Sequence, residues 1–148
     1  MTVKHLTQQI AEAVVTRLTG LTATQDNVFD GEPRALLQAL PALVLKEGAE
    51  HAAIATCAIP RRSERTYLLD IEIKVKDGTP MSELRDIRRQ VETAMASDRT
   101  FGGLVKDSYL TGKDDPHISY DLEKPVGVMP LHYEIKYACP ENQPTTPA

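Results

Sequence analysis

The chain has 148 residues, of which 41% are hydrophobic and 26% are charged, which is enough for one domain with a buried core. Seventeen lysine and arginine residues against 21 aspartate and glutamate residues give a formal net charge of −4, which argues against a dedicated nucleic-acid-binding protein. Two cysteines cannot form a disulfide framework, and the sequence has no apolar signal-peptide core and no membrane-length apolar run. A reducing cytoplasm is therefore the expected setting.

The N-terminal segment predicts an amphipathic helix over about residues 4–19. Gly20 ends the helical pattern, as glycine often does at a helix C-terminus. After the turn at Asp30-Gly31, Pro33 suits the first turn of a short helix that reaches Leu37. The apolar side chains of the long helix share one face: Leu6, Ile10, Ala13, Val14, Leu18 and Leu21.

The next segment predicts a short buried strand, because Ala42–Leu45 is a short apolar run. The polar and flexible residues Lys46-Glu47-Gly48 are expected to end this strand. The following residues, Glu50–Glu64, fit two interpretations, a strand extension or a long hairpin loop. Long loops in small domains are usually functional or disordered. We therefore expect this segment to contact a partner.

The most regular part of the chain is a strand followed by a helix. Apolar and polar residues alternate along Tyr67–Lys76, which predicts a strand with one buried and one solvated face. Met81–Met95 then carries Leu84, Ile87 and Val91 on one side, which predicts a second amphipathic helix whose apolar face lies on the sheet.

The C-terminal third predicts three further strands, Leu104–Leu110, His117–Leu122 and Met129–Tyr137, with a polar turn at Lys113–Pro116. Pro130 in the last of them suggests an edge position or a bulge, since proline cannot donate a ladder hydrogen bond.

Together these elements predict an α+β fold, a single domain with a mostly antiparallel or mixed β-sheet and two main helices packed on one face. The domain is expected to cover residues 1–138. Residues 139–148 contain three prolines and no large apolar side chain, which predicts a disordered tail.

No pattern in the sequence predicts an enzyme active site or a cofactor site. Gly112-Lys113 resembles the end of a phosphate-binding loop, but Asp107 and Asp114 replace the glycine and the hydroxyl residue that the motif requires. Cys57 has small apolar neighbours and is interpreted as a packed hydrophobe. A weaker alternative is a hard-cation site formed by an acidic group: Asp107, Asp114, Asp115, His117 and Asp121.

The order of elements and several segments resemble the tail terminator proteins of long-tailed bacteriophages, the lambda-like minor tail protein family. The resemblance covers roughly Lys4 to Tyr137 and rests on patterns rather than on chemical signatures. A further segment, Asp98–Leu104, is similar to related phage tail-completion proteins. The matching segments are Ile10–Leu18, Val28–Gly31, Leu40–Val44, Leu69–Ile73, Ser82–Arg85 and Leu131–Tyr137.

The resemblance implies a structural virion protein without catalytic residues, metal or cofactor. It implies a ring of identical subunits, typically a hexamer, which caps the head-proximal end of the tail tube, stops tube polymerisation and offers a surface to the head. The implied partners are other copies of the chain, the major tail tube protein and a head connector, with assembly in the host cytoplasm, no membrane contact and DNA passing only transiently through the lumen. Expected protein-contact residues are Arg34, Glu50, His51, Arg61, Arg62, Arg65, Lys113, Asp114 and Asp115.

Two alternatives remain open on the sequence. A head-closure or head–tail joining protein would share the structural role but bind a different partner. A small metal-dependent hydrolase built on the acidic group is the remote alternative.

Overall fold

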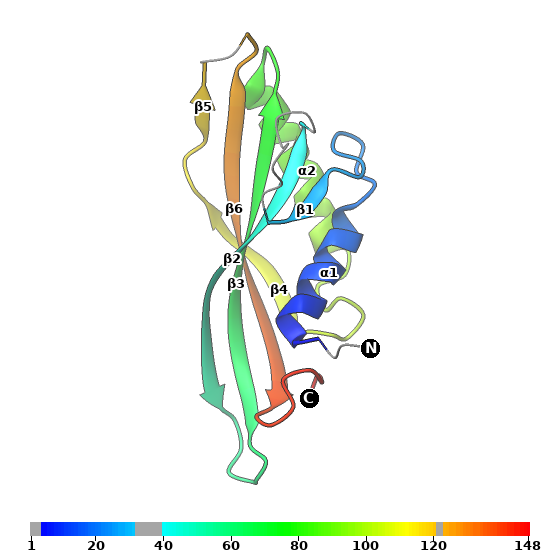
Figure 1. Ribbon diagram of the computed structural model, residues 1–148, viewed down its shortest axis with the longest axis vertical. Coiled ribbons are helices and arrows are strands. Elements are labelled where there is room, and N and C mark those ends of the chain that lie inside the picture. Colours follow the sequence, from blue (N-terminus) through cyan, green and yellow to red (C-terminus); the bar gives the residue numbers. More distant parts are fainter. Residues whose placement is uncertain (1–3, 32–39, 121–122) are drawn as a thin grey trace.

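The computed structural model describes residues 4–31, 40–120 and 123–148, and these residues form two helices and six strands (Figure 1). The elements are α1 (Leu6–Leu18), β1 (Val28–Asp30), β2 (Ala42–Ile54), β3 (Arg62–Lys76), α2 (Pro80–Ala96), β4 (Asp107–Lys113), β5 (His117–Ser119) and β6 (Val126–Pro140).

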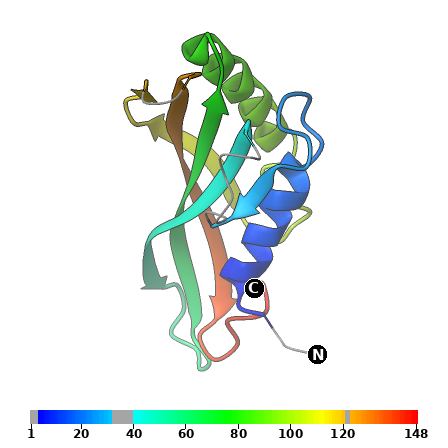
Figure 2. The ribbon, with the colours of Figure 1, turned by 45° about the horizontal axis from the view of Figure 1, so that its top comes forward.

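All six strands belong to one sheet with the order β1-β2-β3-β6-β4, in which β5 also pairs with β6. The β1–β2 pair is parallel, and every other pair is antiparallel. Both helices lie on the same side of the sheet (Figure 2). The mixed sheet with two helices on one face confirms the predicted α+β class.

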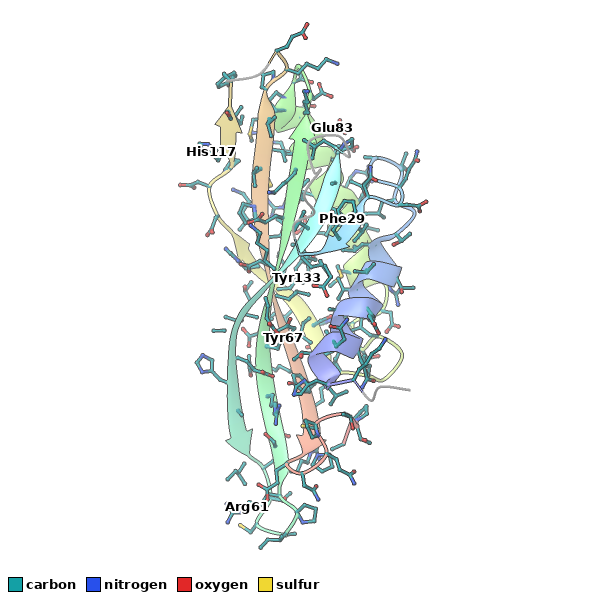
Figure 3. All side chains as sticks on the ribbon, in the orientation of Figure 1. Phe29, Arg61, Tyr67, Glu83, His117 and Tyr133 are labelled. Atoms are coloured by element: carbon teal, nitrogen blue, oxygen red, sulfur yellow. The ribbon has the colours of Figure 1, made fainter. Side chains whose placement is uncertain are left out.

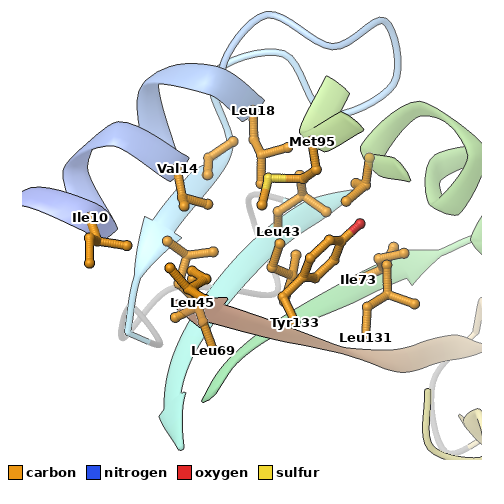
Figure 4. Close-up of a cluster of buried hydrophobic side chains, with 14 of the residues drawn as sticks. Ile10, Val14, Leu18, Leu43, Leu45, Leu69, Ile73, Met95, Leu131 and Tyr133 are labelled. Carbon is orange, nitrogen blue, oxygen red and sulfur yellow. The ribbon is translucent and has the colours of Figure 1, made fainter. Parts of the chain in front are cut away.

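The core lies between the helices and one face of the sheet (Figure 4). The predicted helix stripe of α1 is fully buried at Ile10, Val14 and Leu18. The alternation of β3 directs its apolar residues into the same core, and β6 adds Tyr133 from the neighbouring strand. The period-two and helical patterns therefore predicted the buried faces correctly.

Strand β2 is much longer than predicted. It continues past Lys46-Glu47-Gly48 to Ile54, with a register shift between Glu47 and Glu50. At Gly48 a Cβ atom would lie 3.0 Å from the backbone oxygen of Leu68, so a side chain would disturb the close approach of the two strands. Glycine at this bulge therefore prolongs the strand pairing rather than ending it.

Of the two interpretations of Glu50–Glu64, the strand extension is confirmed. Strand β3 starts at Arg62, five residues before the predicted Tyr67, and pairs with β2 as far as the Ile54–Ser63 pair. Only residues 55–61 connect the two strands.

Strand β6 is central, so the edge position predicted from Pro130 is wrong. It pairs with β3 on one side and with β4 and β5 on the other. The Pro130 carbonyl accepts a hydrogen bond from the Asp114 N–H at 3.2 Å, on the side where β4 ends and β5 has not begun. Because the N and O atoms of one strand residue point to the same side, the missing N–H of Pro130 costs no bond to β3.

Two other strand predictions change in their limits. Strand β4 starts at Asp107 rather than Leu104, because the preceding residues turn with positive φ angles at Phe101, Gly102 and Gly103. Strand β5 ends at Ser119, and residues 121–122 lie outside the described part of the chain. The predicted short helix at Pro33–Leu37 also lies outside it.

The end of the chain returns to the domain. Cys139 and Pro140 belong to β6, and Cys139 is fully buried, so the sheet extends beyond the boundary expected at residue 138. Leu6 N–H, in the first turn of α1 where helix donors lack helical partners, donates to the Pro144 carbonyl at 2.9 Å. The division of the chain into a domain and a disordered tail stays a prediction.

Candidate interaction surface

The most exposed part of the molecule is the far half of the β2–β3 pair, residues 46–61, which we call the projecting hairpin. Every residue from Lys46 to Arg61 is exposed to solvent. In Figure 1 it extends beyond both helices at the lower end of the sheet. Strand pairing continues here, although neither helix covers it.

The tip of the projecting hairpin is apolar. Ile59 is 85% exposed and Ile54 is 60% exposed, which makes them two of the three large hydrophobic side chains that are exposed in the described residues. Cys57 is also exposed, so its interpretation as a packed hydrophobe is wrong: the small residues around it lie on an uncovered strand end rather than in a core. Apolar side chains gathered on a protrusion are typical of a protein contact.

The base of the projecting hairpin is held by a polar cluster against the helix side of the sheet. The Tyr137 hydroxyl donates to the Glu50 carboxylate. The Arg65 guanidinium lies over the Tyr137 ring, 6.0 Å from its centroid, and Arg65 Nη1 is 3.4 Å from His5 Nε2. Burial and the Glu50 carboxylate raise the pKa of Tyr137, so the hydroxyl keeps its proton and remains a donor. Glu50 and Arg65 thus stabilise the hairpin base.

The other predicted contact residues of this region are more accessible. His51 follows Glu50 in the strand, so its side chain lies on the opposite face of the sheet from the helices. Arg61 is exposed at the end of the hairpin (Figure 3). Arg62 Nη2 is 3.9 Å from a Glu64 carboxylate oxygen, while its Nε is buried without a hydrogen-bond partner in the described residues.

The predicted contact residues outside the projecting hairpin lie in other parts of the molecule. Lys113 ends β4, and Asp114 and Asp115 follow in the connection to β5, on the far side of β6 from β2. The structure therefore does not bring them together with Glu50, His51 and the arginines. Arg34 lies outside the described residues. The assignment of all nine residues to protein contacts stays a prediction.

The open face of the sheet carries a polar cluster that we did not predict. His132 Nδ1 is 2.6 Å from Asp70 Oδ1, and His132 Nε2 is 2.9 Å from Asp114 Oδ1. Hydrogen bonds with these two carboxylates raise the pKa of His132. The alternating pattern placed Asp70 and His132 on the polar faces of their strands, but it contained no information on their pairing.

A groove opens on the helix side between the end of α2 and strand β4, which lies at the other edge of the sheet from β2. Its volume is about 280 Å³, and its apolar lining comes from Met95, Ala96, Leu110 and Tyr133. Tyr133 is almost completely buried, and its hydroxyl makes no hydrogen bond within the described residues. Burial raises the pKa of Tyr133, so this hydroxyl also stays protonated.

Two further properties concern metals and membranes. Within residues 4–31, 40–120 and 123–148, no three acidic, histidine or cysteine side chains are grouped as a metal site would require. Asp121, part of the acidic group considered for a cation, lies outside these ranges. Neither described helix has the length and apolar content needed to cross a membrane.

Comparison with known proteins gives a distant likeness among solved structures and no match by sequence. No protein-family model matches the chain, and no curated protein matches its sequence. Among solved structures, the chain is similar to one described as "Virion of native gene transfer agent (GTA) particle", with 16% identity over 89% of this chain and 90% of that chain and a TM-score of 0.36. A TM-score of 0.36 does not demonstrate a common fold.

Proposed function

We propose that this chain is a structural virion protein of a long-tailed phage, the tail terminator. Copies of the chain form a ring, in this proposal a hexamer, on the head-proximal end of the tail tube. The ring stops tube polymerisation and provides the surface to which the head attaches. The sequence resemblance described above suggests this role, and the projecting hairpin is the structural observation that carries it.

The projecting hairpin supports a contact role because it exposes what a soluble monomer normally covers. Its apolar tip lies outside the core, and its outer backbone edge is unpaired among the residues that the structure describes. The Ala55 N–H donates to the Arg62 carbonyl at 2.8 Å, so alternation directs the N–H groups of Glu50, Ala52 and Ile54 away from β3. Strand β1 pairs only with Leu43–Leu45, and no other described residue pairs with the rest of this edge. Such an edge favours association with another chain.

The two sides of the sheet favour a ring over a two-fold dimer. The β2 edge is long and has no charged side chain between Ala52 and Ile54 that would oppose pairing with another strand. The β4 edge differs, because it has a bulge between Leu110 and Gly112 and ends in Lys113, and both features oppose such pairing. Unlike surfaces on opposite sides of one subunit suit head-to-tail contacts, and such contacts generate rings when the rotation closes.

The charge of the chain is compatible with DNA passing through the ring. A formal net charge of −4 gives a mildly repulsive surface overall, and phosphate binding to proteins depends on basic side chains. DNA would then slide through the lumen rather than bind there.

The test uses the tube protein of the same phage. Purified tail-tube protein is allowed to polymerise with and without this chain, and tube lengths and tube ends are observed by electron microscopy. We expect tubes that stop growing and carry a cap at one end. Tube growth that continues unchanged in the presence of excess chain would contradict the proposal.

A binding assay separates the terminator from the head-closure alternative. The chain is immobilised and offered the assembled tube and the head connector separately. The terminator is expected to retain the tube, since it must recognise the last tube ring. Retention of the connector alone would favour a head-closure protein instead.

A further inference from the structure

We propose that Ile59 at the tip of the projecting hairpin enters the groove between α2 and β4 of a second copy of the chain. This contact deepens the ring proposed above, on which it rests, by assigning its two complementary surfaces. The donor surface is an exposed apolar side chain at the end of the β2–β3 pair. The acceptor is an apolar groove beside β4, at the opposite edge of the same sheet.

The donor is defined by exposure and by its support. Ile59 is the most exposed of the large hydrophobic side chains in the described residues. The Arg61 carbonyl accepts a hydrogen bond from the Glu141 N–H at 2.8 Å, and the Tyr137–Glu50 contact holds β2 farther up. The tip is therefore presented on a supported strand pair, which lowers the entropy lost on binding.

The acceptor has the chemistry of a side-chain site. Met95, Ala96 and Leu110 provide an apolar lining, and Tyr133 is an almost fully buried side chain whose hydroxyl has no hydrogen-bond partner within the described residues. Its volume of about 280 Å³ is just below the roughly 300–1,000 Å³ of sites for drug-sized ligands. A groove of this size suits one or two aliphatic side chains, and the free hydroxyl can donate to a backbone carbonyl beside them.

Ile59 cannot occupy the groove of its own subunit. Tyr133 pairs with Leu69 of β3, whereas the tip extends beyond Arg62 at the start of that strand. At about 3.3 Å per residue, roughly 23 Å separate Arg62 from Leu69 along the strand. Figure 3 shows Arg61 at the end of the hairpin, well away from Tyr133 near the middle of the sheet. The occupant must therefore come from another molecule.

The charges around the two surfaces favour the same pairing. Arg61 is exposed two residues from Ile59. The carboxylate of Glu92 lines the groove and is only partly covered by its ion pair with Arg88, at 3.2 Å. The Arg99 guanidinium also lines the groove, but the Asp107 carboxylate compensates its charge at 2.9 Å.

Crosslinking can test the contact because Cys57 lies near the tip and is exposed. The substitution Ala96→Cys adds a second thiol on the exposed side of the groove, while Cys139 is buried and will not react. With a short bismaleimide reagent we expect a ladder of dimers, trimers and larger products. The matched variant Ser82→Cys, with an equally exposed thiol at the other end of α2, is expected to give no ladder.

Mixing two half-reactive proteins tests the direction of the contact. Wild type supplies only the tip thiol, and a tagged Cys57→Ser/Ala96→Cys variant supplies only the groove thiol. Head-to-tail contact predicts crosslinked dimers with one chain of each kind and no larger product. Adding Ile59→Asp to wild type should lower the dimer yield about tenfold or more, since burial of an isoleucine is lost. Tyr120→Asp, a similar change at another exposed side chain, should leave the yield unchanged.

Several outcomes would overturn the contact. These are equal ladders from Ala96→Cys and Ser82→Cys, products no larger than dimers from Ala96→Cys alone, or a yield that Ile59→Asp does not change. If the chain stops tube growth but gives no ladder of crosslinked products, this contact is contradicted and the proposed function is supported. If the chain gives the ladder but leaves tube growth unchanged, the tail-terminator role is contradicted and the contact is supported.

Discussion

Strand β2 passes through two environments that differ in burial but not in backbone pairing. Its first residues, Ala42–Leu45, are buried, while its remaining residues, from Lys46 to Ile54, are exposed. Both parts pair with β3. The helix-covered half thus combines hydrogen bonds with apolar burial, and the projecting hairpin has hydrogen bonds alone. The comparison suggests that one half stabilises the fold while the other is kept available for contacts.

The largest expected effect comes from the same substitution in the two halves. Ile71→Ala removes a fully buried side chain from β3 and should lower the free energy of unfolding by about 2–5 kcal/mol. Ile54→Ala, in the projecting hairpin, should change it by less than about 0.5 kcal/mol. Urea unfolding of both variants gives the two values. Similar losses would show that the hairpin contributes to the core and would remove the distinction between the halves.

A smaller effect is expected where α2 touches the sheet in the covered half. A Cβ atom at Gly127 would lie 3.0 Å from Leu84 Cδ1 and 3.2 Å from Pro80 Cβ. Gly127→Ala should therefore force α2 away from β6 and destabilise the protein by about 1–3 kcal/mol. Gly78 has no atom within 4 Å of such a Cβ, so Gly78→Ala is the matched control. Equal thermal unfolding midpoints for the two variants would contradict this close packing.

The polar cluster at the hairpin base should have a local effect. Tyr137→Phe removes the hydroxyl that donates to Glu50 and should cost about 0.5–1.5 kcal/mol, the usual net contribution of a hydrogen bond. Amide hydrogen exchange should accelerate in the far parts of β2 and β3 and stay unchanged around Ile71. Uniform acceleration throughout the sheet would mean that the hairpin and the covered half unfold together.

The smallest effect concerns pH and the open face of the covered half. The pKa of His132 is raised by Asp70 and Asp114, so the stabilisation is complete below the unfolded pKa of about 6.5 and is lost as pH rises through the folded pKa. Because the group is partly exposed, we expect less than about 1 kcal/mol. Urea unfolding from pH 5.5 to 8.5 should show a fall in stability above about pH 6.5 that His132→Asn lacks. A pH dependence shared by this variant would assign the effect to other groups.

Sequence patterns predicted the covered half well, because burial is what creates them. The alternation of β3 and the stripes of α1 and α2 follow from one face being apolar. The far part of β2 has no such pattern: its alanines, Gly48 and Glu50 have low strand propensity. Pairing with β3, which is non-local, forms this strand. Because pairing with β3 rather than local propensity forms it, strand β2 is much longer than the four residues predicted.

The candidate surfaces were predictable only in part. From the sequence we predicted a partner contact for residues 50–65, and this stays a prediction. A base residue such as Arg65 and a tip residue such as Arg61 could not be distinguished without the fold. The groove beside Tyr133 combines residues from α2, β4 and β6, which no local pattern connects. The edge position predicted from Pro130 was wrong because proline lacks only one backbone N–H donor. That donor would point to the gap between β4 and β5, where no strand needs it.

The return of the chain end to the domain affects how the protein can be labelled. The Ala148 N–H donates to the Ala138 carbonyl at 2.9 Å, so the last residue lies beside β6 near the base of the projecting hairpin. An affinity tag fused there would crowd the surface that we propose for assembly. The turn at Gly78, roughly 45 Å away at the opposite end of β3, is a better insertion point for an epitope or a fluorophore.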